Sequence, residues 1–359
     1  MEIILKTPNP YKGGLIGIAG QTFLLFLLSS LSISLILTGS LSAGIHKDVG
    51  TTGFSFLKLG VGARSVAMGG AATALADDPS AMYYNPAATI KLEDRQFLAG
   101  YHNYVLDIQS GFVAGTMPFW GDKSIGAFID YMNYGDFTRT NSAGVVDPDD
   151  GEFSGGDFLL GINFSTPIPP FPALSAGINA KFMTEMADGY SSEAFAFDLG
   201  LYYEFRDSAT TAGLAVTNLG WVLSGFSSGS EGEVKDDLPM ALRLGVSHSL
   251  KELPLIAAID GVYPNDNNPY INAGLEMYYF QPLYLRLGYS SFGENYKTES
   301  GGNALGGFSF GFGLDYREFQ FSYGFVPYLD LGTSHRITVK WGIGNAASNS
   351  DNPGDMSDY

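Results

Sequence analysis

The sequence predicts an all-β protein, a 14-stranded antiparallel transmembrane β-barrel with an N-terminal plug, or hatch, inside it. From Gln96 onward, apolar and polar residues alternate with the period of two that is typical of strands. The 359 residues include 47 Gly, 26 Phe and 21 Tyr, while only 16% are charged, a composition that suits strands in an apolar environment. The predicted connections between strands alternate between short and long, as they do in outer-membrane barrels.

Residues 1–44 are predicted to be a signal peptide that is removed after export. Two lysines precede a long uncharged run, and Ser40, Ser42 and Gly44 offer small residues for cleavage. The alternative is a retained membrane helix, because about 20 apolar residues suffice to span a bilayer. The serines within the run and its small-residue end favour cleavage. Export would place the rest of the chain beyond the inner membrane.

The next stretch, which is rich in Gly and Ala and fits neither a long helix nor an alternating strand, is predicted to form the plug over residues 45–92. Asp78 and Pro79 favour the start of a short helix towards Tyr84, and Asn85-Pro86 stops it. The glycines allow close backbone approach, but they lack the spacing of a phosphate-binding loop. The plug residues expected to matter are Gly60, Gly62, Arg64, Gly69, Gly70, Asp77, Asp78, Asn85 and Pro86.

The run FLKLGVGARSVAMGGAATALADDPSAMYYNPA resembles the N-terminal signature of the PorV/PorQ-like outer-membrane proteins. Its Asn-Pro-Ala ending is also similar to the hatch region of FadL-type fatty-acid channels, which belong to the same barrel superfamily. The resemblance implies a barrel of fourteen strands, here residues 93–343, with this run folded inside it.

The fourteen strands can be placed by their turn signals. We expect them near 96–104, 110–119, 123–138, 153–166, 173–186, 192–205, 210–222, 238–250, 254–262, 270–279, 283–291, 306–316, 319–326 and 334–343. One face of these strands is apolar and aromatic, and the other is mostly Gly, Ser and Asn with scattered charges, which fits a narrow polar lumen. Charges in such a lumen need partners.

Every second predicted connection is tight, and several of the others are long and acidic. Short turns face the periplasm in outer-membrane barrels, so we expect both termini there, in the outer membrane of a Gram-negative-type bacterium. Residues 344–359 are polar and aperiodic, and are expected to form a disordered tail. Matching the inner faces across the turn at Phe280–Pro282 sets Tyr278 against Tyr284 and predicts a lumenal ion pair between Glu276 and Arg286.

Composition also argues against several classes of function. The net charge of −18 disfavours nucleic-acid binding, which needs clustered Lys and Arg. The chain has no Cys, and its four His are not at metal-ligand spacing, so no metal and no cofactor are expected. Nothing in the sequence brings a Ser, a His and an acid together, so we do not expect an enzyme; an enzyme that acts on an envelope lipid is a minor alternative.

The resemblance implies an accessory or interaction role in protein secretion, of the type IX kind, or in surface attachment. Its partners would be outer-membrane lipid and secreted proteins or secretion-system subunits. The alternative is a FadL-like channel for uptake of hydrophobic small molecules such as fatty acids. A continuous apolar tunnel past Met68, Leu75, Met82 and Tyr83 would favour transport, whereas a sealed lumen with an exposed apolar loop surface would favour partner binding.

Overall fold

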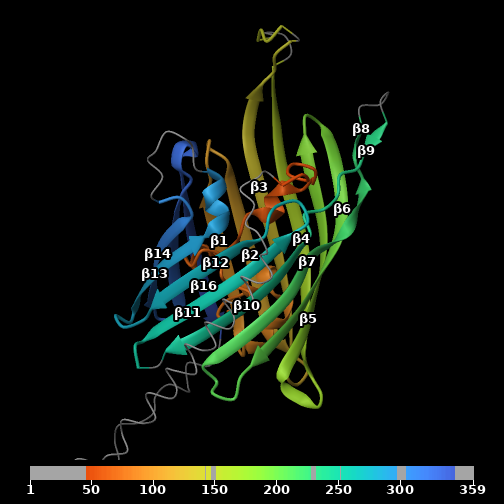
Figure 1. The fold of residues 1–359 in the computed structure, drawn as a ribbon. Helices are drawn as coiled ribbons and strands as arrows, with labels where there is room; N and C mark the ends of the chain where they lie inside the picture. The colour runs from red at the N-terminus through yellow and green to blue at the C-terminus, as the bar shows by residue number, and fades with distance from the viewer. Residues whose placement is uncertain are drawn as a thin grey trace, which may run out of the picture. The chain divides into compact units, whose positions relative to one another are not determined.

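The computed structural model describes residues 46–141, 143–146, 151–227, 232–250, 252–296 and 305–343. The predicted signal peptide, 1–44, and the predicted tail, 344–359, lie outside these residues. In the described part, fourteen strands pair antiparallel and close into a barrel, which confirms the predicted all-β barrel of fourteen antiparallel strands (Figure 1).

The barrel strands are β1 (Arg95–Asn103), β2 (Gln109–Phe119), β3 (Lys123–Thr138), β4 (Glu152–Ile168), β5 (Phe171–Ala187), β6 (Tyr190–Glu204), β7 (Thr210–Ser224), β10 (Ala241–Leu250), β11 (Leu255–Pro264), β12 (Tyr270–Met277), β13 (Leu283–Ser290), β14 (Phe308–Tyr316), β15 (Phe319–Pro327) and β16 (Thr333–Ile343). Each pairs with its neighbour along the chain, and β1 closes the barrel on β16.

Two features differ from the predicted strand series. The strand predicted at 238–250 begins at Ala241, because Pro239 has no N–H to donate to a ladder. The connection after β7 contains an extra small sheet of two short strands, β8 (Phe226–Ser227) and β9 (Glu233–Val234). Two-residue strands are too short to produce a period-2 pattern, so no alternation of residues indicates them.

The helical elements are all short. They are η1 (Ser55–Lys58), α2 (Ala63–Ala67), α3 (Ala81–Tyr84), η2 (Pro86–Lys91), η3 (Ser291–Tyr296) and η4 (Leu329–Leu331). Within the described residues, none has the length and apolar character that a membrane-spanning helix needs.

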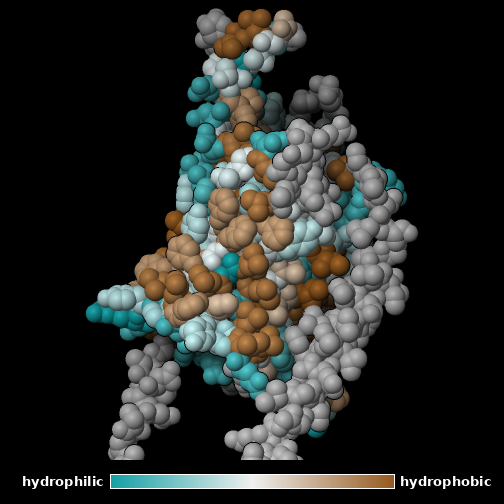
Figure 2. Space-filling model, turned by 60° about the vertical axis from the view of Figure 1, so that its left-hand side comes forward, coloured by the Kyte–Doolittle hydropathy of each residue, from teal (hydrophilic) through white to brown (hydrophobic). Residues whose placement is uncertain are grey.

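The two faces of each strand differ as a membrane barrel requires. On β14, Phe310, Phe312 and Leu314 are 37%, 46% and 41% exposed, whereas Ser309 on the opposite face is 3% exposed. Figure 2 shows hydrophobic side chains gathered over the middle of one face of the molecule, with hydrophilic ones above and below. The outer wall is therefore apolar, and the polar face of the strands is turned inward.

The strands are much longer on one side of the barrel. Strands β3 to β7 have 15 to 17 residues, whereas β10 to β15 have 8 to 10. The extra length lies at the end with the long connections. There, β10 begins opposite Thr217 and leaves residues 218–224 of β7 beyond it, and β2 begins opposite Asn133 and leaves 134–138 of β3 beyond it.

The N-terminal segment, residues 46–92, packs against the inner faces of the strands. It starts at the end with the long connections, where the backbone N–H of Gly53 donates to the carbonyl of Asp237 at 3.1 Å. It finishes at the other end, because β1 follows it and Arg95 pairs with Ile343. The prediction that both termini are periplasmic concerns residues outside the described part of the chain.

Inward-facing glycines let the backbone of this segment lie directly against the wall. A Cβ added at Gly177 on β5 would sit 2.3 Å from the nitrogen of Ala87, and one at Gly213 on β7 would sit 2.1 Å from the oxygen of Thr73. On the opposite part of the wall, a Cβ at Gly288 would sit 2.0 Å from the nitrogen of Gly69. Only glycine allows these approaches, so the segment fits closely against several strands at once.

Candidate functional site in the barrel lumen

A buried ionic cluster joins the N-terminal segment to the wall. Glu276 and Arg286 lie opposite each other in the β12–β13 register, and Arg286 Nε donates to Glu276 Oε2 at 2.6 Å. The same carboxylate accepts from Arg64 of α2, whose Nε and Nη2 lie 2.8 and 2.7 Å from its two oxygens. Arg64 also pairs with Asp77 at 2.8 Å. Burial disfavours the charged form of Arg64, but Asp77 and Glu276 outweigh it and raise the pKa of the guanidinium.

The remaining predicted plug residues make local contacts. Asp78 accepts from the N–H of Ser80 at 2.8 Å, within the segment itself. A carboxylate at the start of a short helix satisfies an otherwise free N–H in this way. Asn85 contacts both the N-terminal segment and the barrel wall. Its Nδ2 donates to the carbonyl of Thr73 in the segment at 2.9 Å and to that of Leu201 on β6 at 3.0 Å. The carbonyl of Pro86 accepts from Asn163 Nδ2 at 3.1 Å.

The predicted glycines show two features, which Gly69 and Gly70 share. Gly62, Gly69 and Gly70 have φ values of 76°, 71° and 80°, which glycine adopts without strain. Gly60, Gly69 and Gly70 line the cavity described below.

Asp260 of β11 is a second residue of the wall that holds the N-terminal segment, and sequence reasoning missed it. Its buried carboxylate accepts from the N–H groups of Ala72 and Thr73, both at 2.9 Å, and from the Thr73 hydroxyl at 2.7 Å. Arg243 of β10 lies 3.8 Å away. The only sequence signal was an acidic residue at an inward position of a predicted strand. Its partners are nearly 190 residues away in the chain, beyond the reach of any local pattern.

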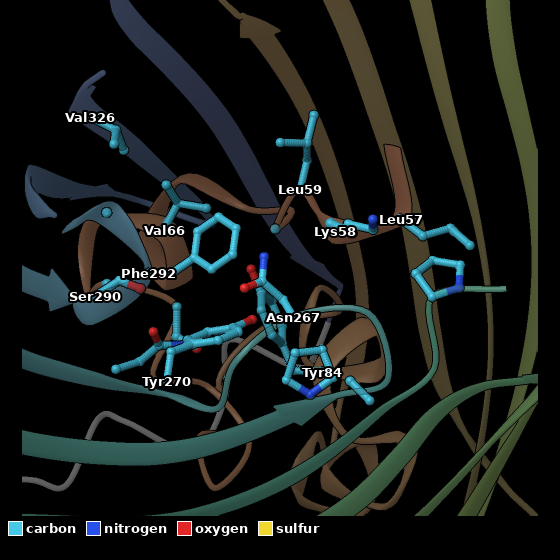
Figure 3. Close-up of a pocket in the computed structure, with 18 of the residues that line it drawn as sticks. Leu57, Lys58, Leu59, Val66, Tyr84, Asn267, Tyr270, Ser290, Phe292 and Val326 are labelled. Atoms are coloured by element: carbon cyan, nitrogen blue, oxygen red, sulfur yellow. The ribbon is translucent and has the colours of Figure 1, made fainter. Parts of the chain in front are cut away.

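A cavity of about 340 Å³ lies between the N-terminal segment and the end of the barrel with the long connections. Figure 3 shows side chains from separate parts of the chain gathered around it, among them Val66, Tyr84, Tyr270 and Phe292. The apolar and aromatic residues of its lining are Leu57, Leu59, Val66, Tyr83, Tyr84, Pro239, Ala241, Pro264, Tyr270, Phe292, Val326, Pro327 and Tyr328. A concave apolar lining with a few polar groups is typical of small-molecule sites.

Tyr83 and Tyr84 of the N-terminal segment form one side of the cavity. The Tyr84 hydroxyl donates to the carbonyl of Val61 at 2.8 Å, and the Tyr83 hydroxyl donates to that of Leu57 at 2.9 Å. Burial raises the pKa of the Tyr84 phenol to about 12, although the guanidiniums of Arg336 and Arg243 oppose this rise. Tyr84 is therefore neutral at ordinary pH and serves as a hydrogen-bond donor that fixes the segment.

An ion pair closes part of the rim. Lys58 of η1 pairs with Asp266, which lies in the connection between β11 and β12. The Thr52 hydroxyl donates to the same carboxylate at 2.6 Å. These contacts tie the beginning of the N-terminal segment to a long connection and hold η1 beside the cavity.

The cavity does not continue along the predicted route. Its lining includes Tyr83 but not Met68, Leu75 or Met82, whose side chains are 0%, 7% and 0% exposed. The cavity thus lies at one end of the lumen and does not extend to Met68, Leu75 or Met82.

No protein-family model matches the sequence, and no curated protein does. Among solved structures, the toluene transporter TodX of Pseudomonas putida is similar at 16% identity and a TM-score of 0.55, over 79% of this chain and 98% of TodX. A TodX deltaS2S3 mutant, described as a monoaromatic hydrocarbon channel, is similar at 16% identity and a TM-score of 0.50 over the same shares. A FadL homologue of Pseudomonas aeruginosa has 12% identity and a TM-score of 0.48, over 84% of this chain and 99% of its own. At these identities, the likeness to TodX shows the fold alone: the chain forms a barrel similar to that of TodX.

Proposed function

We propose that this protein is an outer-membrane channel that takes up hydrophobic small molecules, with the N-terminal segment acting as its internal plug. The observation that carries the proposal is the cavity of about 340 Å³, which is largely apolar and lies in the lumen at the end with the long connections. The likeness of the fold to TodX, a toluene transporter, supports the same conclusion.

The closed barrel and its apolar outer face support a location in the outer membrane. A barrel satisfies all backbone polar groups without open edges, which is one of two ways to cross a bilayer. With short turns on the periplasmic side, the cavity would face the outside of the cell.

The role of a plug is supported by three sets of contacts. The ionic cluster at Glu276, the hydrogen bonds to Asp260 and the close approaches at inward glycines all hold the segment across the lumen. A compound in the cavity would therefore leave either by a rearrangement of this segment or by passing between strands.

The accessory role in secretion, predicted from the PorV/PorQ resemblance, receives no support from the structures reported above. The channel for hydrophobic compounds, which was the alternative reading of the sequence, agrees better with the cavity and with the fold. We therefore do not assign secreted proteins or secretion-system subunits as partners.

An uptake assay with a cavity-filling variant tests the proposal. Val326 lines the cavity from β15, whereas Phe321 on the same strand is 42% exposed on the outer face. Cells that lack their own channels for these compounds would produce the wild type, V326W or F321W, and uptake of labelled naphthalene and labelled hexadecanoate would be measured. We expect the wild type and F321W to accelerate uptake of at least one compound and V326W to slow it. Equal uptake with and without the protein would refute the proposal.

A further inference from the structure

A row of three aromatic rings crosses the outer wall near the end of the barrel with the short turns. Trp341 of β16 lies between Phe319 of β15 and Phe97 of β1, each of which is opposite it in the register. The ring centroids of these two residues are 6.0 and 6.2 Å from that of Trp341. All three side chains are exposed on the outer face. The row therefore forms the edge of the apolar wall, where membrane barrels meet the lipid head groups.

Pairs of adjacent acidic and basic residues flank this row at the rim of the barrel. Asp94-Arg95 stands at the start of β1, and Arg317-Glu318 forms the turn before β15. Because β16 lies between β15 and β1, and neighbouring strands are about 4.8 Å apart, the two dipeptides lie about 10 Å from each other around the rim. A third pair, Asp122-Lys123, stands at the start of β3.

The opposite charges of these dipeptides do not neutralise each other. Within the part of the chain that the structure describes, none of the six residues takes part in an ion pair. Two of the basic groups lie over rings instead: the Arg317 guanidinium is 5.4 Å from the centroid of Tyr316, and the Lys123 ammonium is 5.7 Å from that of Trp120. Both signs of charge are therefore available to a partner outside the chain.

A pair at the opposite end of the barrel shows the contrast. Glu233 and Lys235, which are also exposed and close in sequence, lie 3.3 Å apart and neutralise each other. Exposure alone therefore does not explain why the rim dipeptides are unpaired.

We propose that the aromatic row and the dipeptides Asp94-Arg95 and Arg317-Glu318 bind phosphatidylethanolamine in preference to other phospholipids. Its phosphate would accept hydrogen bonds from the basic residues, its primary ammonium would donate to the carboxylates, and its acyl chains would lie along the rings. Phosphatidylcholine has no N–H to donate, and phosphatidylglycerol has no cation for the carboxylates. The inference rests on the outer-membrane location in the proposed function, but not on the cavity.

Quenching of tryptophan fluorescence by lipids with brominated acyl chains tests the preference. The chain has three Trp, so W120F/W221F leaves Trp341 as the reporter within the row. This variant would be reconstituted in phosphatidylcholine vesicles that contain a brominated lipid with either head group and equal chains. We expect phosphatidylethanolamine to bind beside Trp341 about fivefold more tightly than phosphatidylcholine. In W120F/W341F, the reporter is Trp221 on β7, and the two lipids should quench it equally.

Charge variants in the Trp341 background separate a lipid site from an ordinary aromatic edge. D94N/R95Q and R317Q/E318Q should each lower the preference, and the four changes together should abolish it. E233Q/K235Q removes a paired acid and base and should leave the preference unchanged. Should the fourfold variant fail to fold, as judged by circular dichroism, the two double variants decide the matter.

The outcomes also distinguish this inference from the proposed function. Equal quenching of Trp341 by the two lipids, a preference that survives the charge changes, or tighter binding of brominated phosphatidylglycerol would overturn the phosphatidylethanolamine site. Each of these results leaves the uptake channel in place. Conversely, a protein that shows the lipid preference but does not accelerate uptake would overturn the channel and keep the lipid site.

Discussion

Arg64 and Glu276 are joined by two hydrogen bonds, from Nε at 2.8 Å and from Nη2 at 2.7 Å, although 212 positions separate them in the chain. Such a two-point contact between a guanidinium and a carboxylate fixes orientation as well as distance. Because Arg286 shares the same carboxylate, Glu276 compensates two buried positive charges.

Replacing Glu276 by Gln should therefore destabilise the protein strongly. The change leaves Arg64 and Arg286 as neighbouring buried cations, and breaking a buried pair typically costs about 3 to 5 kcal/mol. Unfolding in urea, followed by circular dichroism in detergent, measures the loss. E318Q, at an exposed turn position, is the matched control and should unfold as the wild type does. Equal stability of E276Q and the wild type would contradict the assigned role of this carboxylate.

Gly213→Ala should loosen the N-terminal segment from the wall. The added Cβ would lie 2.1 Å from the carbonyl oxygen of Thr73, so one of the two backbones must shift. Overpacking of this kind costs about 1 to 3 kcal/mol. Faster proteolysis within residues 46–92 measures the loosening. The control is G342A, because a Cβ there meets nothing within 4 Å; a protease pattern shared by the two variants would refute the close fit.

Asp260→Asn should weaken the same segment by a different mechanism. The amide would present a donor to a site where two backbone N–H groups and one hydroxyl donate to the carboxylate. Leaving buried donors unsatisfied costs about 1 to 3 kcal/mol. Hydrogen exchange at Ala72 and Thr73 should accelerate in D260N and stay unchanged in D122N, which lies in an exposed turn. Unchanged protection in both variants would show that Asp260 does not hold these amides.

A disulfide can lock the segment without disturbing other thiols, because the chain has no cysteine. The hydroxyl oxygens of Thr89 on η2 and Ser165 on β4 lie 2.9 Å apart, so T89C/S165C should oxidise readily. Neither residue lines the cavity, so a hydrophobic fluorescent probe should bind in the cavity as it does in the wild type. Because the segment fits closely against the wall, we expect uptake to survive the crosslink, with each single-cysteine variant as the control. Uptake that stops on oxidation and returns on reduction would show instead that η2 must move.

Much of the barrel could be predicted because strand signals are local. The alternation over Phe308–Tyr316 is visible within nine residues, and the opposition of Glu276 and Arg286 follows from a single hairpin turn. The cavity could not be predicted, since its lining comes from the N-terminal segment and several connections that meet only after the barrel closes.

The partners of individual lumenal charges also could not be predicted from the sequence. Arg64 and Asp260 both find partners about 190 residues or more away, and no periodic pattern links the N-terminal segment to a given strand.

The unequal strand lengths affect how a compound would reach the cavity from the membrane. Strands of 9 to 11 tilted residues cross the hydrocarbon layer, so in the proposed outer-membrane location β10 to β15 would end close to the lipid head groups, while the ends of β3 to β7 would stand in water. Each residue of a strand adds about 3.3 Å of length. Residues 218–224 of β7 therefore extend the wall beyond the start of β10, and they do so on the side of the long strands only. Tyr270, Ser290 and Val326, which line the cavity, belong to the short side. A molecule dissolved in the outer leaflet would therefore have a shorter path to the cavity than one arriving across the tall side from bulk water.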